Sequence, residues 1–219
     1  MYFDLDDIDP QIGYKLMTAT VTPRPIAWVT TLSPGGHVNA APYSFFNVMG
    51  HTPPTLVLGL LADPQRGFKD TAANILEGGA FVVNLVSEAL APQMNITSMN
   101  APREFSELQA AGLTALPSRL VAPPQIKESP VSFECETFST VVTGPHQAIA
   151  IGRIRSIRID DAYVQDAQRG HVDTTALRLV ARMHGSGWYA RSTDLFQMDR
   201  PSFADWQAGT TPEDPKKND

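Results

Sequence analysis

The sequence predicts a mainly β protein with helices, an α+β chain in which a β-barrel carries a few helices. Short segments rich in β-branched and aromatic residues recur along the chain, and turns containing Gly or Pro separate them. Only a few helical segments lie between these strands, so the regular alternation of a βα protein is absent. No G-x-G-x-x-G sequence opens a helix, which disfavours a dinucleotide-binding parallel sheet.

The N-terminal part of the chain predicts a short helix followed by a β-hairpin. A helix over residues 9–17 begins with an Asp-Pro pair, which is typical of a capped helix start. Residues 26–32 predict a strand, and a Ser-Pro-Gly-Gly turn at 33–36 leads into a returning strand over 38–46. Because Pro42 lies inside the second strand, we expect an edge strand or a bulge there.

The remainder of the chain predicts further strands and helices within a single domain. Strands are expected over 56–61, 81–86, 132–143 and 148–159, helices over 69–77, 87–99 and 103–111, and a polar loop over 165–173. The apolar alternation of the last strand shifts once, which indicates a bulge. Since neither a repeat nor a linker is present, residues 1–209 are expected to form one domain. The polar segment 210–219 is expected to be a disordered tail.

Composition narrows the class of protein. The chain has 219 residues and a formal net charge of -6, which disfavours a surface for nucleic acid or anionic membranes. Its one cysteine, Cys135, excludes an internal disulfide and is expected to be a buried, inert thiol. The longest apolar run is too short to span a membrane and the N-terminus lacks signal-peptide order, so we expect a cytoplasmic protein. The histidines are scattered, and no metal site is expected.

The first candidate binding stretch covers residues 23–31. Two prolines around Arg24 stiffen the chain just before a strand. Such a start can hold the strand backbone and the hydroxyls of Thr30 and Thr31 against a flat ligand. The alternative is an ordinary edge strand with a proline-stiffened start.

The second stretch covers residues 39–47. Its small residues let a ligand approach the backbone, while Tyr43 and two phenylalanines supply flat apolar surface and Ser44 offers a hydrogen bond. This combination suits an aromatic ring with polar edges. The alternative is that Phe45 and Phe46 are core residues.

The third stretch covers residues 66–71, where a helix is expected to begin. Arg66, Lys69 and the hydroxyl of Thr71 make a candidate phosphate site together with the N–H groups of the helix start. The carboxylate of Asp70 competes with this interpretation, because it can cap the helix itself.

The fourth stretch surrounds His184, which precedes two closely spaced glycines in a predicted tight turn. A histidine there can hydrogen bond a cofactor, donate a proton or contact a neighbouring subunit. The alternative is a structural loop histidine.

At these stretches the chain resembles the flavin-reductase-like family, close to its flavoredoxin branch. The matching segments are PRPIAWVTT at 23–31, NAAPYSFFN at 39–47, FKDTAANI at 68–75, FVVN at 81–84 and HGSGWYAR at 184–191. Each segment alone is a weak signal, but the five in this order and spacing are specific. The resemblance implies an FMN-binding split β-barrel, usually a homodimer with flavin sites near the subunit interface, and non-covalently held FMN.

The resemblance also implies roles for individual residues. The cofactor-binding residues are expected to be Arg24, Trp28, Val29, Thr30, Thr31, Asn39, Tyr43, Ser44, Phe45, Phe46, Arg66, Lys69, Asp70 and Thr71. Residues 28–31 would line the isoalloxazine or ribityl region, and Asn39 with residues 43–46 would lie along its other side. Arg66, Lys69 and Thr71 would neutralise the phosphate. His184, the candidate catalytic residue, would lie near the cofactor or across the dimer interface.

Three hypotheses about function follow. The first is an FMN-dependent oxidoreductase that takes electrons from NADH or NADPH, with the flavin supplying the chemistry. The second is a flavoredoxin-like electron-transfer protein or flavin carrier that a protein partner reduces. The third is a split-barrel protein without flavin. No nicotinamide fingerprint distinguishes NADH from NADPH.

Overall fold

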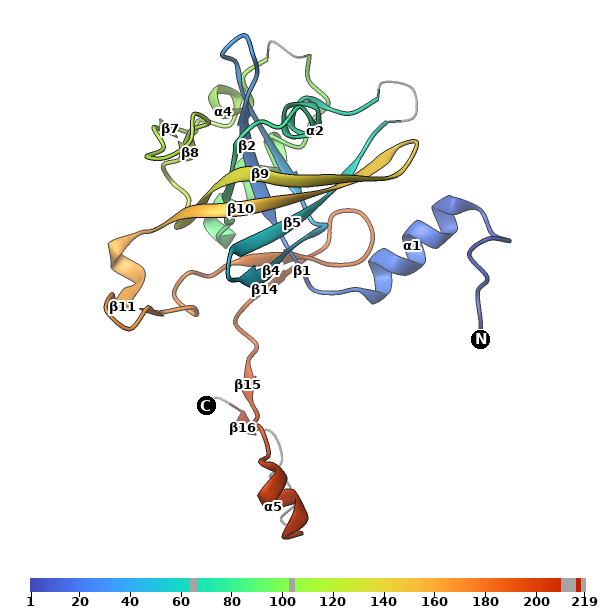
Figure 1. The fold of residues 1–219 in the computed structure, drawn as a ribbon, viewed down its shortest axis with the longest axis vertical. Coiled ribbons are helices and arrows are strands. Elements are labelled where there is room, and N and C mark those ends of the chain that lie inside the picture. The colour runs from blue at the N-terminus through green and yellow to red at the C-terminus, as the bar shows by residue number, and fades with distance from the viewer. Residues whose placement is uncertain (64–66, 103–104, 210–215, 218–219) are drawn as a thin grey trace.

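The computed structural model describes residues 1–63, 67–102, 105–209 and 216–217. At its centre is a sheet of seven strands in the order β3-β2-β6-β9-β10-β5-β4 (Figure 1). These are β2 (Ala27–Leu32), β3 (Val38–Tyr43), β4 (Phe46–His51), β5 (Pro54–Leu61), β6 (Phe81–Asn84), β9 (Val131–Gly144) and β10 (Gln147–Ile159). Every neighbouring pair in this sheet is antiparallel.

The bend between β3 and β4 closes this sheet into a barrel. The two strands stand at opposite ends of the strand order, yet only Ser44 and Phe45 separate them along the chain. The N–H of Gly59 in β5 also donates to the carbonyl of Phe45 over 2.7 Å. The predicted fold class, mainly β with helices, is therefore confirmed.

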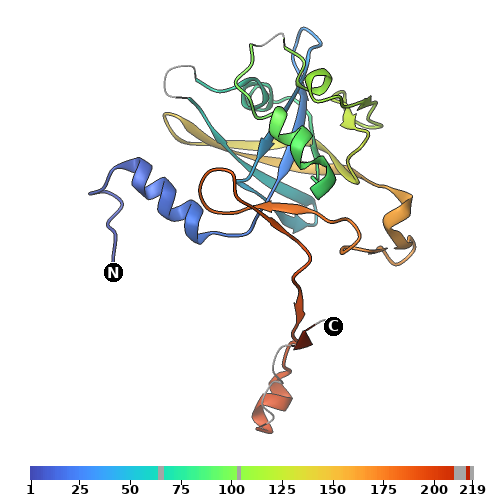
Figure 2. The same ribbon diagram turned by 180° about the vertical axis from the view of Figure 1, so that it is seen from behind.

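Short helices lie outside the barrel. They are α1 (Pro10–Thr20), α2 (Asp70–Leu76), α3 (Ala91–Ile96), α4 (Glu107–Ala110) and α5 (Phe203–Gln207), with single 3-10 turns η1 (Glu88–Leu90) and η2 (Asp161–Tyr163). In Figure 2 the green segment that contains η1 and α3 lies in front of the sheet. The predicted helix start is confirmed, because the carboxylate of Asp9 accepts from the N–H of Gln11 over 2.7 Å.

Smaller strands complete the structure. They are β1 (Arg24–Pro25), β7 (Ala115–Leu116), β8 (Gln125–Ile126), β11 (Val164–Asp166), β12 (His171–Val172), β13 (Val180–Arg182), β14 (Tyr189–Arg191), β15 (Phe196–Gln197) and β16 (Lys216–Lys217). β1, β13 and β14 form a separate three-stranded sheet in which Arg24 lies opposite Arg182. This sheet brings the loop that carries His184 close to the chain just before β2.

Both faces of β2 are covered. Val29 points into the barrel, where it packs with Phe81 and the apolar side chains of β5. Trp28 points to the opposite face and packs with Met94 of α3 and Leu108 of α4. Successive side chains of a strand alternate between its faces, so a strand covered on both sides has no exposed residue in its middle.

Cys135 belongs to the barrel core. Its thiol is free and buried, which confirms the burial predicted from the sequence. Burial raises the pKa of this thiol, and the neighbouring carboxylate of Glu134 adds to the effect. A thiol held protonated in this way is a poor nucleophile.

Several boundaries differ from the sequence predictions. The strand expected over 38–46 is two strands, because the chain bends at Ser44 and Phe45 to change its partner from β2 to β5. The helix expected over 87–99 is η1 followed by α3, and the helix expected over 103–111 is only α4 in its described part. The polar segment 165–173 contains the β11–β12 hairpin rather than a loop alone.

Two further regions refine the sequence predictions. The pairing of β9 with β10 shifts register at three places, where the sequence indicated one bulge. Pro42 lies in β3, which is an end strand of the ladder, as expected for a proline inside a strand. Of the predicted tail, 210–215 and 218–219 lie outside the described residues, and 216–217 pair with β15. β15 and α5 lie away from the barrel (Figure 1).

Gly152→Ala is expected to lower the free energy of unfolding by about 1–2 kcal/mol, because the barrel interior has no room for another methyl group. A Cβ at this position would lie 2.5 Å from Cζ of Phe81 and 3.3 Å from Cδ1 of Leu56. Urea-induced unfolding measures the change. Gly35→Ala is the matched control, since its Cβ would meet nothing closer than 3.6 Å. Equal losses in the two variants would contradict tight packing at Gly152.

Candidate functional site

Two adjoining cavities lie beside the bend that joins β3 to β4. The first, of about 470 Å³, is enclosed by β3, the start of α2 and the segment 97–102. The second, of about 1170 Å³, lies between α1, β1 and the loop 184–187. The two share Tyr14, Pro42, Tyr43, Ser44 and Ser98, so one ligand can extend from one into the other.

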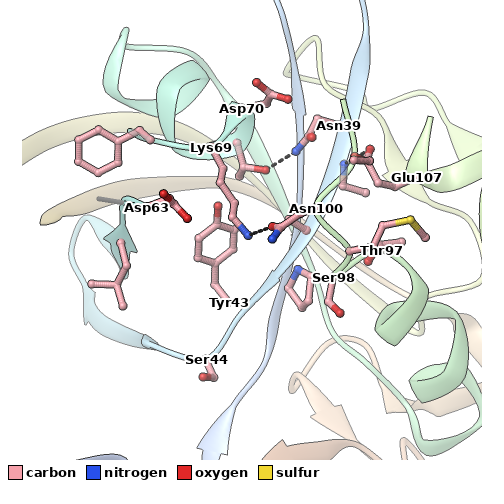
Figure 3. A pocket seen from close by; sticks show the side chains of 18 of the residues that line it. Asn39, Tyr43, Ser44, Asp63, Lys69, Asp70, Thr97, Ser98, Asn100 and Glu107 are labelled. Atoms are coloured by element: carbon pink, nitrogen blue, oxygen red, sulfur yellow. Dashed lines mark hydrogen bonds between the residues drawn. The ribbon is translucent and has the colours of Figure 1, made fainter. Parts of the chain in front are cut away.

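A hydrogen-bonded group links β3 to α2 at the first cavity (Figure 3). The side-chain amide of Asn39 donates to the hydroxyl of Thr71, which is fully buried in the first turn of α2. The phenol of Tyr43 is hydrogen bonded to the same threonine. Two of the predicted stretches, far apart in sequence, are therefore held together at one wall of this cavity.

The side chain of Lys69 points toward Asn100 at the first cavity (Figure 3). Its ammonium group donates to Oδ1 of Asn100 over 2.6 Å, in an exposed contact. Among the described residues that line this cavity, Lys69 is the one lysine or arginine, whereas Asp63, Asp70 and Glu107 are carboxylates. An anionic ligand group in this cavity therefore depends strongly on Lys69.

Glu107 is a buried carboxyl at the same cavity. Burial raises its pKa, and the charge of Asp70 adds to the increase. The N–H of Ala40 lies 3.4 Å from its Oε2, a long hydrogen bond that favours the ionised form only weakly. Such a group keeps its proton to higher pH than an exposed glutamate does.

The pKa of Tyr43 is raised to about 12, chiefly by burial, while its hydrogen bond to Thr71 opposes the increase. A tyrosine of the unfolded chain ionises near its ordinary pKa of 10.0. The contribution of Tyr43 to stability is therefore complete below pH 10 and is lost as the pH rises from 10 to about 12.

We expect Tyr43→Phe to remove this part of the alkaline loss of stability, because phenylalanine does not titrate. Thermal unfolding of both proteins across this pH range measures the difference. Tyr163→Phe is the control, because it removes a phenol that lines neither cavity. Identical pH profiles for the Tyr43 variant and the unmodified protein would contradict the expectation.

The second cavity contains the predicted histidine. His184 is exposed and stacks on Trp188, with the ring centroids 6.0 Å apart. Arg24 lines the same cavity but is buried, and its guanidinium donates to the carbonyl oxygens of Thr18, Val21 and Met183. These bonds tie the end of α1 to the chain just before the histidine loop.

The structure brings nine of the fifteen predicted site residues to these cavities. The first is lined by Asn39, Tyr43, Ser44, Phe45, Lys69, Asp70 and Thr71, and the second by Arg24, Tyr43, Ser44 and His184. Arg66 lies outside the described residues. Trp28, Val29, Thr30, Thr31 and Phe46 line neither cavity.

The side chains of β2 have partners inside the protein. Trp28 donates to the hydroxyl of Thr97 over 2.9 Å, and the hydroxyl of Thr30 donates to a backbone carbonyl. Thr31 accepts from the side-chain amide of Asn74 over 3.0 Å. β2 lies between β3 and β6, so it is not the edge strand that was the alternative interpretation. Of the two phenylalanines, Phe46 packs against the barrel core and Phe45 lines the cavity.

Sequence reasoning missed several residues of the site. Tyr14 and Lys15 lie on α1, whose first turns gave only a helix signal. Asn100 follows the helix expected over 87–99, Glu107 lies within the helix expected over 103–111, and no motif marked either residue. A carboxyl among apolar residues, such as Glu107, was the one available signal.

The described residues contain no group of three or more His, Cys, Asp or Glu side chains placed to hold a metal ion. Within the same part of the chain, no helix has the length and apolar character needed to cross a membrane.

Comparison with known proteins identifies the family. The model described as a flavin reductase like domain matches residues 18–175. A protein of Deinococcus radiodurans is 42% identical over 210 residues, which are 94% of this chain and 92% of the relative.

Two solved structures are similar along nearly their whole length. Nitrilotriacetate monooxygenase component B of Bacillus cereus has a TM-score of 0.84 at 28% identity, covering 90% of this chain and 98% of that one. The 2-nitrobenzoate 2-nitroreductase NbaA of Pseudomonas fluorescens has a TM-score of 0.82 at 31% identity, covering 93% and 98%. The family predicted from five short motifs is confirmed: this chain belongs to the flavin reductase-like family of split-barrel proteins.

Proposed function

We propose that the protein binds FMN without a covalent bond and acts as an oxidoreductase that NADH or NADPH reduces. One observation carries the proposal: the first cavity gathers residues of two separate family motifs, Asn39 and Tyr43 from β3 and Lys69 and Thr71 from the start of α2. Family membership supports flavin chemistry in general, and the similarity to a nitroreductase supports reduction of a small molecule. The more specific part of the proposal is that a nicotinamide nucleotide is the electron donor.

The residues present fit the chemical parts of FMN. Lys69 offers the charge for the phosphate, and Thr71, whose hydroxyl is bonded to Asn39 and Tyr43, holds the wall of the cavity at the start of α2. Phe45 and Tyr14 make an edge-to-face pair, with ring centroids 6.1 Å apart, that provides apolar surface for a flat ring. Ser44, at the bend, lines both cavities and can bond a polar ring edge.

The chain's own part in the reaction would be to bind, orient and shield. Bound FMN would supply the transfer of a hydride or of single electrons. Tyr43 would stay protonated at neutral pH. Burial also raises the pKa of Glu107, so this carboxyl would ionise less readily beside the ring than an exposed glutamate does. His184, exposed at the second cavity, is our candidate for moving a proton to or from the substrate.

We also propose a cytoplasmic homodimer. Large apolar side chains are exposed on β4 and on the second half of β9, among them Val48 and Met49 of β4 and Phe138 and Val142 of β9. Exposed apolar groups of this size are typical of protein–protein contact surfaces. Sedimentation velocity on the full chain tests the dimer, and a monomer at micromolar concentration would contradict it.

The visible absorption spectrum of the purified protein tests the main proposal. We expect a flavin spectrum, directly or after FMN is added, that bleaches when NADH or NADPH is supplied under anaerobic conditions. A flavin spectrum that neither nucleotide bleaches would favour the flavoredoxin-like carrier reduced by a protein partner. Failure to take up FMN would contradict flavin binding itself.

A further inference from the structure

The second cavity has an unusual charge for so acidic a chain. Its lining includes Lys15, Arg24, Arg182 and His184, and the described residues that line it include no aspartate or glutamate. The whole protein has a formal net charge of -6. Positive charge gathered in a concave site without counter-charges raises the local concentration of anions.

Arg24 is the buried part of this positive charge. Its side chain is 6% exposed, and one Nη donates to Thr18 and Val21 over 2.6 and 2.8 Å while the other donates to Met183 over 3.0 Å. Its Nε is buried without a hydrogen-bond partner. Within the described part of the chain, no carboxylate forms an ion pair with this guanidinium. A buried cation with neutral partners alone keeps an uncompensated charge.

The other two cations lie nearer the surface. Arg182 lies over the ring of Tyr189, 4.9 Å from its centroid, and donates to the carbonyl of Gly185 over 3.1 Å. Lys15, on α1, lines the same cavity, and its ammonium group has no ion pair or hydrogen bond among the described contacts. The aromatic side chains of Tyr14, Tyr43 and Tyr189 also line this cavity.

We propose that the second cavity binds the oxyanion, a carboxylate or a phosphate, of a planar substrate whose ring reaches past Tyr43 and Ser44 into the first cavity. The two cavities share these residues, so a ligand held by its anionic end can present its other end at the proposed flavin. Lys15 and Arg182 supply charge-assisted hydrogen bonds, and the buried Arg24 adds a fixed positive charge to the same cavity. That this ligand is a substrate rests on the proposed function. The binding of the oxyanion does not, because it can be measured without flavin.

Calorimetric titration of the full chain, with and without FMN, tests the site. Benzoate and adenosine 5′-monophosphate are the probes for a carboxylate and for a nucleotide phosphate, and benzamide is the neutral analogue of benzoate. We expect at least one anion to bind, and benzamide to bind about tenfold more weakly than benzoate where benzoate binds. Binding of benzoate indicates a small aromatic acid, and binding of the nucleotide alone indicates the phosphate of a dinucleotide donor.

Single substitutions test whether the anion binds in the second cavity. Lys15→Gln and Arg182→Gln are each expected to weaken binding of the anion about tenfold, the equivalent of one charge-assisted hydrogen bond. Lys127→Gln removes the same charge at an exposed position that lines neither cavity, and it should leave the affinity unchanged. Lys15 is exposed on α1, so its replacement leaves the folded core intact.

Three results would overturn the inference: no anion binds, benzamide binds as well as benzoate, or the Lys127 variant loses as much affinity as the other two. Displacement of FMN by the anion would also overturn it, because the cations would then serve the phosphate of FMN. Failure of the proposed function looks different, since the flavin-free protein would bind the anion while FMN failed to bind or to be reduced.

Discussion

Asn84→Ala is expected to lower the free energy of unfolding by about 3 kcal/mol, which corresponds to a fall of about 6–12 °C in Tm for a chain of this size. The amide of Asn84, fully buried at the end of β6, bridges three elements. Its Nδ2 donates to the carbonyl of Trp28 over 3.0 Å. Its Oδ1 accepts from the N–H of Ile126 over 2.9 Å and from the hydroxyl of Ser132 over 2.8 Å.

Alanine would leave these buried groups without a partner and would open a cavity, and both effects destabilise the folded state. Chemical unfolding monitored by tryptophan fluorescence measures the change. Asn47→Ala is the control, because Asn47 is exposed on β4 and bonds only the next N–H of its own strand. A loss of less than 1 kcal/mol in the Asn84 variant would show that water or a shifted side chain replaces the amide.

Lys69→Ala is expected to weaken FMN binding by about 1–3 kcal/mol, or roughly 5- to 150-fold in Kd, because it removes a charge-assisted hydrogen bond to the phosphate. The loss should approach the upper end of this range, since Lys69 is the one lysine or arginine among the described residues that line the first cavity. Lys69→Glu places a negative charge beside the phosphate and should weaken binding further.

Riboflavin separates a phosphate contact from general damage to the cavity. It has the same ring and ribityl chain as FMN but no phosphate, so its affinity should be the same for the Lys69→Ala variant and the unmodified protein. Fluorescence quenching of each flavin gives both dissociation constants. Unchanged FMN affinity would place the phosphate elsewhere, and an equal loss for both flavins would show that Lys69 acts on the shape of the cavity instead.

Local signals predicted many elements of this fold. Asp9 and Pro10 marked the start of α1, because capping and a fixed proline φ act within one turn. The Ser-Pro-Gly-Gly turn at 33–36 marked the β2–β3 hairpin, since a tight turn depends on its own residues. The ends of the helices were harder to predict. The segments η1, α3 and α4 are short, and they are held by packing of Met94 and Leu108 against Trp28. Packing of this kind leaves only a weak pattern in the local sequence.

The candidate site was predicted in part. Motif resemblance identified β3 and the start of α2, and the structure brings both to one cavity through Asn39 and Thr71. It also identified residues 28–31, whose side chains turned out to have internal partners. Apolar and hydroxyl side chains in a strand suit a ligand and a core equally well, so their pattern alone does not distinguish the two.

By itself the sequence determined the family, the mainly β class and the acidic charge, and it identified two stretches that line the first cavity, because these follow from composition, turn chemistry and short motifs. Only the tertiary structure decided which strands neighbour each other, that the bend at Ser44 closes the barrel, and that a carboxylate-rich cavity adjoins a cation-rich one. The physical reason is the distance along the chain over which each kind of interaction acts. Turns and caps are governed by neighbours along the chain, whereas Arg24 and Arg182, 158 positions apart, meet only because β1 pairs with β13.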